Sequence, residues 1–411
     1  MPSSRASFCA MAGSAGSRVS QRGDNMKSML GRGLRAGNAK GFARQGARRL
    51  RCALMGKAFP SAKKKKAKPG GKGVPEFSAK DRFLVTGGAG FIGSVLVGAL
   101  NRWHGTDRVV VVDQLGTDDK WRNLAPLRFE EFVEADDFYD RLAGKAGAFG
   151  NFTHVFHLGA CSSTTERDAD YLLRNNFGCS KQLAEWALAR GSRFVYASSA
   201  ATYGDGSAGM DDLSDDLAAW RPLNAYGYSK QLFDLHAQRE GYLRRIVGLK
   251  YFNIFGPNEE HKGDMRSVVS KAWRQIEETG QVKLFKSYHP DYPDGGQERD
   301  FLYVKDAVAM TLHLAAAKKA GGLFNIGSGE AHTWLDLVHP IFEAMGREAR
   351  IEFIEMPEAL RSQYQYFTQA DVTKLKSTGY EGGITPLHEA VKEYVSRYLL
   401  ARKHFGDGAG D

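Results

Sequence analysis

The 411-residue sequence contains few cysteines, and none of them has the spacing of a metal site. Cys9, Cys52, Cys161 and Cys179 form no Cys-x-x-Cys pair and have no histidine at zinc-finger spacing. We therefore expect thiols in a reducing compartment rather than a disulfide framework. No apolar run approaches the roughly 18 residues of a membrane span, and no apolar core follows a basic start as in a secretory signal. We expect neither a membrane partner nor secretion.

Acidic residues are nearly absent from the first 77 residues, which contain 18 Lys/Arg but only Asp24 and Glu76. That segment has a net charge of +16, whereas residues 78–411, with 39 basic and 45 acidic residues, have a net charge of −6. The net charge of +10 for the whole chain thus reflects its first segment. It gives no reason to expect nucleic-acid binding by the rest of the chain.

Residues 1–77 also lack apolar periodicity and include the lysine run 63–66. Such a segment cannot bury enough apolar surface to offset the entropy of ordering it, so we expect a disordered basic extension. Three explanations stay open. It is an organelle transit peptide, a basic tail for nucleic acid or another anionic surface, or translated sequence upstream of a later start codon.

From residue 82 onward, short β-rich runs alternate with helical patterns. The residues of 82–86 predict a strand, the apolar spacing of 91–103 predicts a helix, and 109–112 predicts a second strand that ends at Asp113. Such alternation predicts an α/β fold, a Rossmann-type doubly wound parallel sheet with helices on both faces. Further predicted strands cover 154–158, 193–197 and 246–251, and further helices cover 169–190 and a stretch that begins near Tyr226.

Three glycines separate the first predicted strand from the first predicted helix. Gly87, Gly90 and Gly93 stand where a tight turn and a close backbone approach to a pyrophosphate need residues without a Cβ. A strand precedes these glycines and a helix follows them, as a dinucleotide site requires. The stretch therefore predicts that a nicotinamide dinucleotide binds here.

The end of the second predicted strand bears on which dinucleotide binds. Asp113 can accept hydrogen bonds from ribose hydroxyls, which favours NAD. Lys120, and less directly Arg122, offers a cation for the 2′-phosphate of NADP. The residues alone leave the choice between NAD and NADP open.

A Tyr-x-x-x-Lys motif predicts the catalytic centre. Tyr226 and Lys230 are four residues apart on a predicted helix, so their side chains share one face. We expect the lysine ammonium to lower the pKa of the phenol, so that the phenol exchanges protons near neutral pH. Ser199 follows the strand 193–197, at the sheet edge where such folds bind ligands. Tyr228 has no lysine four residues later and is the weaker candidate for the acid.

Together these features resemble the extended short-chain dehydrogenase/reductase family, whose members with this layout act on nucleotide-activated sugars. Other segments narrow the resemblance to the ADP-L-glycero-D-manno-heptose 6-epimerases, over roughly residues 82–400. These segments are 159–166 (GACSSTTE), 196–204 (YASSAATYG), 251–257 (YFNIFGP), 261–265 (HKGDM) and 367–371 (FTQAD).

The resemblance implies a reaction and its catalytic residues. ADP-D-glycero-D-manno-heptose is converted to its L-glycero epimer by transient oxidation and reduction at C6 with bound NADP, NAD being possible. Tyr226, tuned by Lys230, and Lys262 are the two proton-transfer groups, and Ser199 polarises the C6 oxygen. Side chains and nicotinamide cover this chemistry, so no metal is expected.

The resemblance also assigns binding residues. The cofactor contacts are Gly87, Gly90, Phe91, Ile92, Gly93, Asp113, Gln114, Lys120, Leu158, Gly159, Ala160, Cys161, Ser162, Asn175, Lys230, Ile254 and Lys262. The substrate contacts are Ser199, Asn253, Asp264, Lys271, Phe285, Lys286, Ser287, Arg299 and Tyr364.

We expect residues 78–255 mainly to form the NADP-binding domain and residues 256–411 mainly a smaller α/β sugar-nucleotide domain, with some chain crossing back. The resemblance further implies a homo-oligomer, specifically a homopentamer, in the cytoplasm, or in an organelle if residues 1–77 are a transit peptide. No nucleic acid is expected to bind the folded part.

Two other functions compete. The first is a 4-epimerase or dehydratase acting on another sugar nucleotide. A dehydratase usually needs an acid pair beside the serine, and Ala200, Ala201 and Thr202 follow Ser199 instead. The second is a protein that senses NAD(P) without catalysis, against which the intact Ser199, Tyr226 and Lys230 argue.

Overall fold

The computed structural model describes residues 75–144, 149–361 and 364–408. The predicted basic extension lies outside these residues up to position 74. Phe77, which the sequence analysis places at the end of that extension, packs its ring against the rings of Phe83, His104 and His154, with centroid distances of 4.9–5.2 Å. None of the helices in the described ranges combines the length and apolar character that a membrane span needs.

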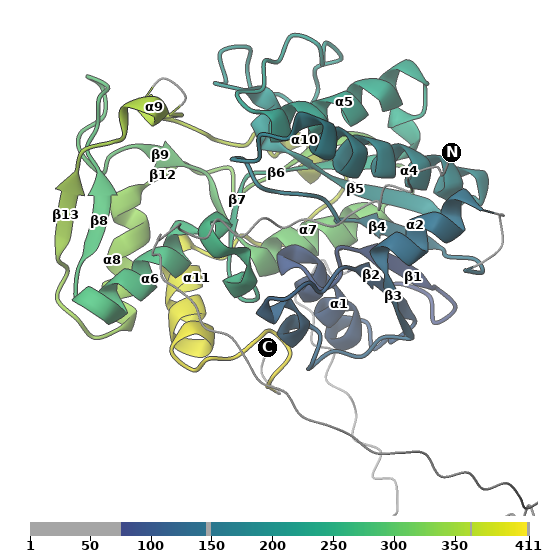
Figure 1. Cartoon of the computed structure of the whole chain (residues 1–411), viewed down its shortest axis with the longest axis horizontal. Coiled ribbons are helices and arrows are strands. Elements are labelled where there is room, and N and C mark those ends of the chain that lie inside the picture. Colours follow the sequence, from purple (N-terminus) through teal and green to yellow (C-terminus); the bar gives the residue numbers. More distant parts are fainter. Residues whose placement is uncertain (1–74, 145–148, 362–363, 409–411) are drawn as a thin grey trace, which may run out of the picture. The chain divides into compact units, whose positions relative to one another are not determined.

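A seven-stranded parallel sheet forms the centre of the fold, in the order β11-β6-β5-β4-β1-β2-β3 (Figure 1). The inner strands are almost entirely buried, as expected for a sheet covered on both faces. The strands are β1 (Phe83–Thr86), β2 (Val109–Asp113), β3 (Glu131–Glu134), β4 (His154–His157), β5 (Arg193–Ser199), β6 (Val247–Tyr251) and β11 (Gly322–Ile326).

Helices cover both faces of this sheet, and each face has its own apolar core. On one face, α1 (Phe91–Trp103) packs against α7 (Val304–Ala316). On the other face lie α2 (Ala135–Ala143), α4 (Cys179–Ala189) and α5 (Ala225–Arg239). This is the doubly wound arrangement that the alternating sequence pattern predicts, and the fold prediction is confirmed.

The C-terminal part of the chain adds three two-stranded pairs. β8 and β13 lie beside α6 and α8, away from the large sheet (Figure 1). β11 follows β8 in sequence but belongs to the large sheet, so the chain returns to that sheet. The predicted domain boundary near residue 255 stays a prediction. The strands are β7 (Asn253–Phe255), β8 (Val282–Phe285), β9 (Glu298–Arg299), β10 (Phe301–Tyr303), β12 (His332–Thr333) and β13 (Ile351–Ile354).

The remaining elements are helices and single turns. The α-helices are α3 (Ala169–Leu172), α6 (Val268–Thr279), α8 (Trp334–Ala344), α9 (Glu358–Arg361), α10 (Thr373–Ser377) and α11 (Leu387–Glu393). The 3-10 turns are Asp119–Asn123, Ala200–Tyr203, Leu243–Arg245 and Glu260–Met265, and the π-helical turns are Leu173–Gly178 and Tyr394–Leu399.

The glycine loop between β1 and α1 lies in close backbone contact with its surroundings. Gly87 has a φ of +70°, and a Cβ there would lie 2.6 Å from the backbone nitrogen of Gly159. A Cβ on Gly93 would lie 2.1 Å from the carbonyl oxygen of Gly87. Neither position accommodates a side chain unless the backbone moves.

We predict that Gly93→Ala lowers the free energy of unfolding by about 1–3 kcal/mol, because the added methyl group forces α1 away from the loop. Chemical denaturation of the full chain measures this change. Gly383→Ala is the matched control, since a Cβ there meets no atom within 4 Å, and we expect it to change stability by less than about 0.5 kcal/mol. Equal stability of the two variants would contradict the close approach.

Candidate active site

A cavity of about 670 Å³ opens where the carboxyl ends of β1, β4 and β5 meet the chain that follows β6. Loops after parallel strands meet at this edge, so residues far apart in sequence line one space. Of the predicted site residues, the lining includes Gly87, Gly90, Phe91, Ile92, Gly93, Asp113, Lys120, Leu158, Gly159, Ala160, Cys161, Ser162, Ser199, Tyr226, Asn253, Ile254 and Lys262.

Asp113 and Lys120 form an ion pair at the glycine-loop end of the cavity. The Asp113 carboxylate lies 2.9 Å from Lys120 Nζ and accepts hydrogen bonds from the backbone nitrogens of Ala89 and Gln114, each at 2.8 Å. Lys120 Nζ also donates to the carbonyl oxygen of Gln114, at 2.6 Å. Gln114 itself does not line the cavity, and its Nε2 donates to Asp136 Oδ1 at 3.3 Å. The charge of Asp113 is therefore largely compensated within the protein.

Ser199, Tyr226 and Lys230 come together from β5 and α5. The hydroxyl oxygen of Ser199 accepts a hydrogen bond from Ala201 N at 3.1 Å, and a hydrogen bond between Ser199 and Tyr226 lowers the pKa of the phenol. Lys230 is buried behind the cavity wall, where its Nζ donates to the carbonyl oxygen of Ala197 at 2.8 Å. Ser199 and Tyr226 line the cavity itself.

The expected lowering of the Tyr226 pKa by Lys230 is wrong. Burial of the phenol raises its pKa above the usual value of 10.0, and the hydrogen bond with Ser199 offsets only part of that rise. Desolvation also lowers the pKa of Lys230 to about 8. Removal of Tyr226 or Lys230 from water disfavours the charged form of the side chain. This desolvation is the largest effect on each pKa, larger than the influence of one side chain on the other that their spacing suggests.

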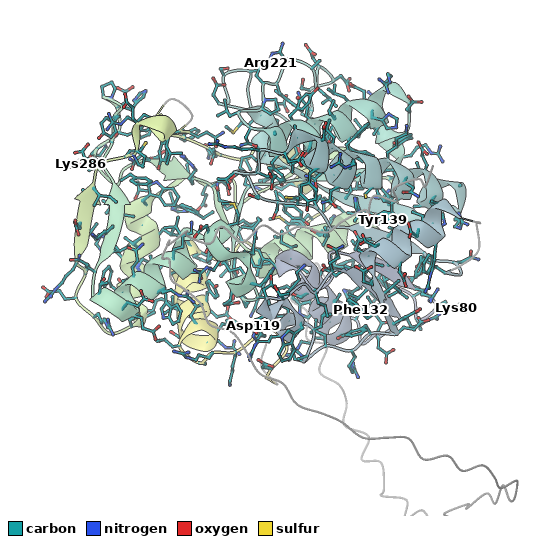
Figure 2. The ribbon with its side chains drawn as sticks, viewed as in Figure 1. Lys80, Asp119, Phe132, Tyr139, Arg221 and Lys286 are labelled. Carbon is teal, nitrogen blue, oxygen red and sulfur yellow. The ribbon has the colours of Figure 1, made fainter. Side chains whose placement is uncertain are left out.

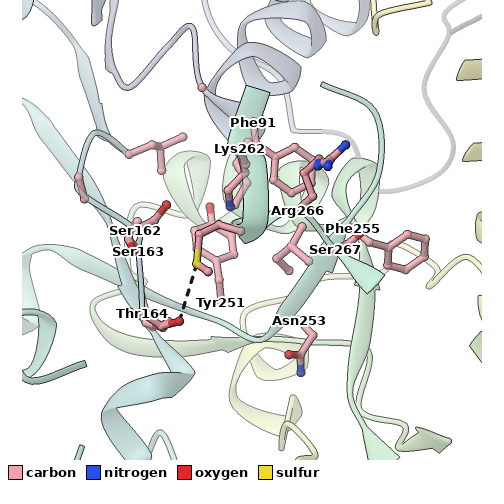
Figure 3. A pocket seen from close by; sticks show the side chains of 18 of the residues that line it. Phe91, Ser162, Ser163, Thr164, Tyr251, Asn253, Phe255, Lys262, Arg266 and Ser267 are labelled. Atoms are coloured by element: carbon pink, nitrogen blue, oxygen red, sulfur yellow. Dashed lines mark hydrogen bonds between the residues drawn. The ribbon is translucent and has the colours of Figure 1, made fainter. Parts of the chain in front are cut away.

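Lys262 enters the same cavity from the 3-10 turn Glu260–Met265. Figure 3 shows it beside Phe91, and its Nζ lies 5.5 Å from the centroid of that ring. Burial lowers the pKa of Lys262, while the Glu259 carboxylate raises it. The turn Glu260–Met265 also contacts the loop after β4 through a hydrogen bond from the Thr164 hydroxyl to the Met265 sulfur, at 3.7 Å (Figure 3).

Asn176, the neighbour of the predicted cofactor contact Asn175, holds the loop after β4. Its side chain accepts from Cys161 N and donates to Cys161 O, both at 2.9 Å, and it also donates to Ser229 Oγ on α5 at 2.9 Å. Asn175 Nδ2 donates to Asn176 Oδ1 at 3.2 Å and does not line the cavity. The π-helical turn Leu173–Gly178 shifts the phase of the helix, which no sequence pattern indicated.

His157 on β4 and Cys161 in the loop after it have structural rather than catalytic surroundings. His157 is buried between Thr86 Oγ1 and Ser180 Oγ, at 2.7 and 2.8 Å, and burial lowers its pKa to about 3. Burial raises the pKa of the Cys161 thiol. His157 is therefore too weak a base to take up a proton near neutral pH, and burial disfavours the nucleophilic thiolate form of Cys161.

Arg299 and Tyr364 lie outside the cavity lining but connect to it through Trp334. The guanidinium lies 5.3 Å from the ring centroid of Tyr364 and 5.9 Å from that of Trp334, and Trp334 Nε1 donates to the Tyr364 hydroxyl at 2.9 Å. Within the described ranges no carboxylate pairs with Arg299; that of Asp300 accepts instead from Ser328, Gly329 and Ala370. A buried guanidinium held by aromatic rings is a planar donor for an anion.

The other predicted substrate residues are not brought into the cavity. Lys286 lies at the end of β8 (Figure 2), and its Nζ pairs with Glu355 Oε1 at 2.7 Å. Ser287 N donates to Asp294 Oδ1 at 2.6 Å, and the carbonyl of Phe285 accepts from Gln297 at 3.5 Å. Asp264 is exposed on the Lys262 turn, and Lys271 is half-buried on α6.

Several lining residues were not predicted as contacts. Those that stand in segments quoted for the resemblance were within reach of the sequence: Ser163, Thr164, Ala197, Ser198, Tyr251, Phe252, Phe255, His261 and Met265. The others lie just before α6, on α6 or in the C-terminal part: Arg266, Ser267, Val268, Val269, Phe301, Trp334 and Leu337.

The residues of the glycine loop fit a nicotinamide dinucleotide. Gly87, Gly90 and Gly93 leave a cradle that a Cβ would fill, at the N-terminus of α1, where backbone N–H groups and the helix dipole favour phosphate. Asp113 and Lys120 lie at one end of this cradle and Cys161 and Tyr226 also line the cavity.

Comparisons with known proteins agree with this architecture. Residues 83–327 match the model of the NAD dependent epimerase/dehydratase family. An ADP-L-glycero-D-manno-heptose-6-epimerase of Nitratidesulfovibrio vulgaris is 52% identical over 319 residues, covering 78% of this chain and 98% of that protein. One of Fusobacterium nucleatum with the same name is 42% identical, covering 77% of this chain and 97% of that protein.

Solved structures show the same fold. The ADP-L-glycero-D-manno-heptose-6-epimerase of Helicobacter pylori superposes with a TM-score of 0.64 at 26% identity, covering 77% of this chain and 96% of that chain. A UDP-glucuronic acid 4-epimerase of Bacillus cereus, solved with NAD, superposes with a TM-score of 0.63 at 25% identity, covering 78% and 100%. By its sequence, fold and glycine loop, the chain belongs to the NAD-dependent epimerase/dehydratase family, and within it groups with the proteins named ADP-L-glycero-D-manno-heptose-6-epimerase.

Proposed function

We propose that the chain converts ADP-D-glycero-D-manno-heptose to ADP-L-glycero-D-manno-heptose, by oxidation at C6 and reduction from the opposite face. One observation carries the proposal: Tyr226 and Lys262 reach the same cavity from different segments of the chain, next to Ser199 and the glycine loop. The names of the relatives supply the substrate. An epimerase of this kind needs two proton-transfer groups, since the oxygen at C6 is approached from two sides.

Each side chain has a distinct task in this reaction. When bound, the nicotinamide supplies the acceptor and donor of the C6 hydride. Ser199 hydrogen-bonds the C6 oxygen and stabilises negative charge on it. Burial leaves Tyr226 protonated at neutral pH and lowers the pKa of Lys262. The cavity therefore offers one group that donates a proton and another that is prepared to accept one.

The cofactor is NADP in this proposal. The Asp113 carboxylate, which would repel a 2′-phosphate, is compensated by Lys120 and by two backbone N–H groups. Lys120 then remains near the ribose end of the cradle as a cation for the phosphate. The cytoplasmic setting and the homo-oligomer stay predictions; the free thiol of Cys161 is compatible with a reducing compartment.

The first prediction concerns the reaction. The full chain with NADP should convert ADP-D-glycero-D-manno-heptose, followed at C6 by proton NMR, and Tyr226→Phe and Lys262→Met should each slow conversion by at least about 100-fold, because each removes a proton-transfer group. Tyr228→Phe and Lys318→Met, which alter exposed side chains, are the controls and should retain activity. If the parent enzyme fails with both NADP and NAD supplied, the heptose reaction is wrong and UDP-sugars are tested next.

The second prediction concerns the cofactor. Lys120→Met should weaken NADP binding about 10-fold or more, the expected effect of losing a charge-assisted bond to phosphate, and should change NAD binding by less than about 3-fold. Calorimetric titration with each nucleotide gives both values. Lys283→Met removes an exposed, ion-paired lysine as a control. A parallel loss for NADP and NAD would show that Lys120 does not read the 2′-phosphate.

The third prediction concerns the diphosphate of the substrate. Arg299→Gln should raise KM for the ADP-heptose by roughly 10–100-fold and affect kcat less, because the guanidinium binds the substrate away from the reacting carbon. Initial rates at varied substrate concentration separate the two effects. The exposed Arg350→Gln serves as control. A change confined to kcat would place Arg299 in the chemical step instead.

A further inference from the structure

A buried ion pair lies behind the active site and takes no part in the proposed reaction. Asp234 on α5 and Lys250 on β6 are both completely inaccessible to solvent, with Lys250 Nζ 3.2 Å from Asp234 Oδ2. The other donors to this carboxylate are the Tyr196 hydroxyl, on Oδ1, and the Ser198 hydroxyl, on Oδ2, both at 2.7 Å. Burial of such a pair costs several kcal/mol per ion in desolvation, and an apolar pair of similar size would often be as stable. The pair therefore calls for a reason beyond stability.

Lys250 is held as firmly as Asp234. Its Nζ donates to Thr202 Oγ1 at 2.5 Å and lies over the rings of Trp220 and Tyr203, 4.4 and 4.7 Å from their centroids. Asp234 forms the ion pair with this ammonium, and Asp212 is a further carboxylate that raises the pKa of Lys250. The network thus has a fixed polarity, with its negative end on α5 and its positive end on β6.

Two links join this network to the proposed catalytic residues. Ser198 directly precedes Ser199, and Thr202 donates to the carbonyl oxygen of Ser199 at 2.8 Å, so both hydroxyls fix the end of β5. Asp234 follows Lys230 by four residues on α5, which puts the two side chains on one face of the helix. The same carboxylate therefore holds β5 against α5 and raises the pKa of the buried Lys230 electrostatically, without a hydrogen bond to it.

The other ionisable groups around Lys230 give it little compensation. On β4, burial keeps His157 neutral, and Lys230 itself contributes to lowering the pKa of that histidine. In the loop after β4, burial raises the pKa of Cys161, and on α5 burial raises that of Tyr226. On β5, the Ala197 carbonyl accepts a hydrogen bond from Lys230 Nζ. Desolvation lowers the pKa of Lys230 to about 8, whereas the Asp234 carboxylate and, after it, Cys161 raise it.

We propose that Asp234, held in place by Lys250, is a positioning residue of the active site that fixes Ser199 against the catalytic helix and supplies the counter-charge for Lys230. The role assigned to Lys230 rests on the proposed function. The ion pair itself makes no contact with the cavity, since neither Asp234 nor Lys250 lines it, and Ser198 connects it to the cavity wall.

The test follows the protonation of Lys230 directly, by carbon NMR of the full chain labelled with ¹³C-lysine, with Lys230→Met to assign the signal. Asp234→Asn should lower the titration midpoint of Lys230 by about one pH unit, because it removes the attraction of the carboxylate that raises the pKa of Lys230. Lys250→Met should leave the midpoint at or above that of the parent, although it breaks the same ion pair. Asp306→Asn, a partly buried carboxylate on α7, is the matched control and should change nothing.

Asp234→Asn leaves Lys250 as an unpaired buried charge and is expected to reduce stability. The double variant Asp234→Asn/Lys250→Met removes both charges and keeps the test available, and its Lys230 midpoint should also fall. A midpoint unchanged in the variants that lack Asp234, or lowered equally by Lys250→Met alone, overturns the proposal.

Kinetics then separate this proposal from the proposed function. In an active parent enzyme, the alkaline limb of the kcat profile should move down with the Lys230 midpoint in Asp234→Asn, whereas a purely structural role would lower kcat equally at all pH values. An inactive parent enzyme would refute the proposed function while leaving the NMR result for Asp234 intact.

Discussion

The site depends on one constraint, the convergence of parallel strand ends at a single edge of the sheet. β6, β5, β4 and β1 are four successive strands of that sheet, so the loops that follow them share one space. Gly87 brings the first loop to within backbone contact of Gly159 after β4, and Gly93 lets α1 begin directly against the loop. A side chain at either position would separate the elements between which the cofactor cradle forms.

Partial exclusion of water from this edge governs its electrostatics. Burial lowers the pKa of the lysines Lys230 and Lys262 and raises that of Tyr226, so every group moves toward its neutral form. The counter-charges are placed outside the reacting space: Glu259 raises the pKa of Lys262, and Asp234 raises that of Lys230. Neither carboxylate lines the cavity, so neither competes for the sugar.

Sequence reasoning succeeded where the signal is local. The bounds of α1 agree with the predicted helix 91–103, and the glycine spacing and the Tyr226–Lys230 spacing each describe one turn or one helix face. It failed where the answer depends on distant packing. The π-helical turn that places Asn176 against Cys161 has no local signature, and the ring cluster that holds Arg299 is assembled from segments at least 30 residues apart. The direction of the Tyr226 pKa shift also required the burial of the phenol to be known.

In the proposed reaction, the C6 hydrogen of the heptose is removed and returned inside the cavity. The most direct measurement uses ADP-D-glycero-D-manno-heptose with deuterium at C6, incubated with the full chain and NADP in ordinary water. The account predicts that the L-glycero product retains the deuterium at C6, because hydride transfer does not exchange with solvent. Replacement of the deuterium by solvent hydrogen would contradict it and would show that the cavity removes the C6 hydrogen as a proton.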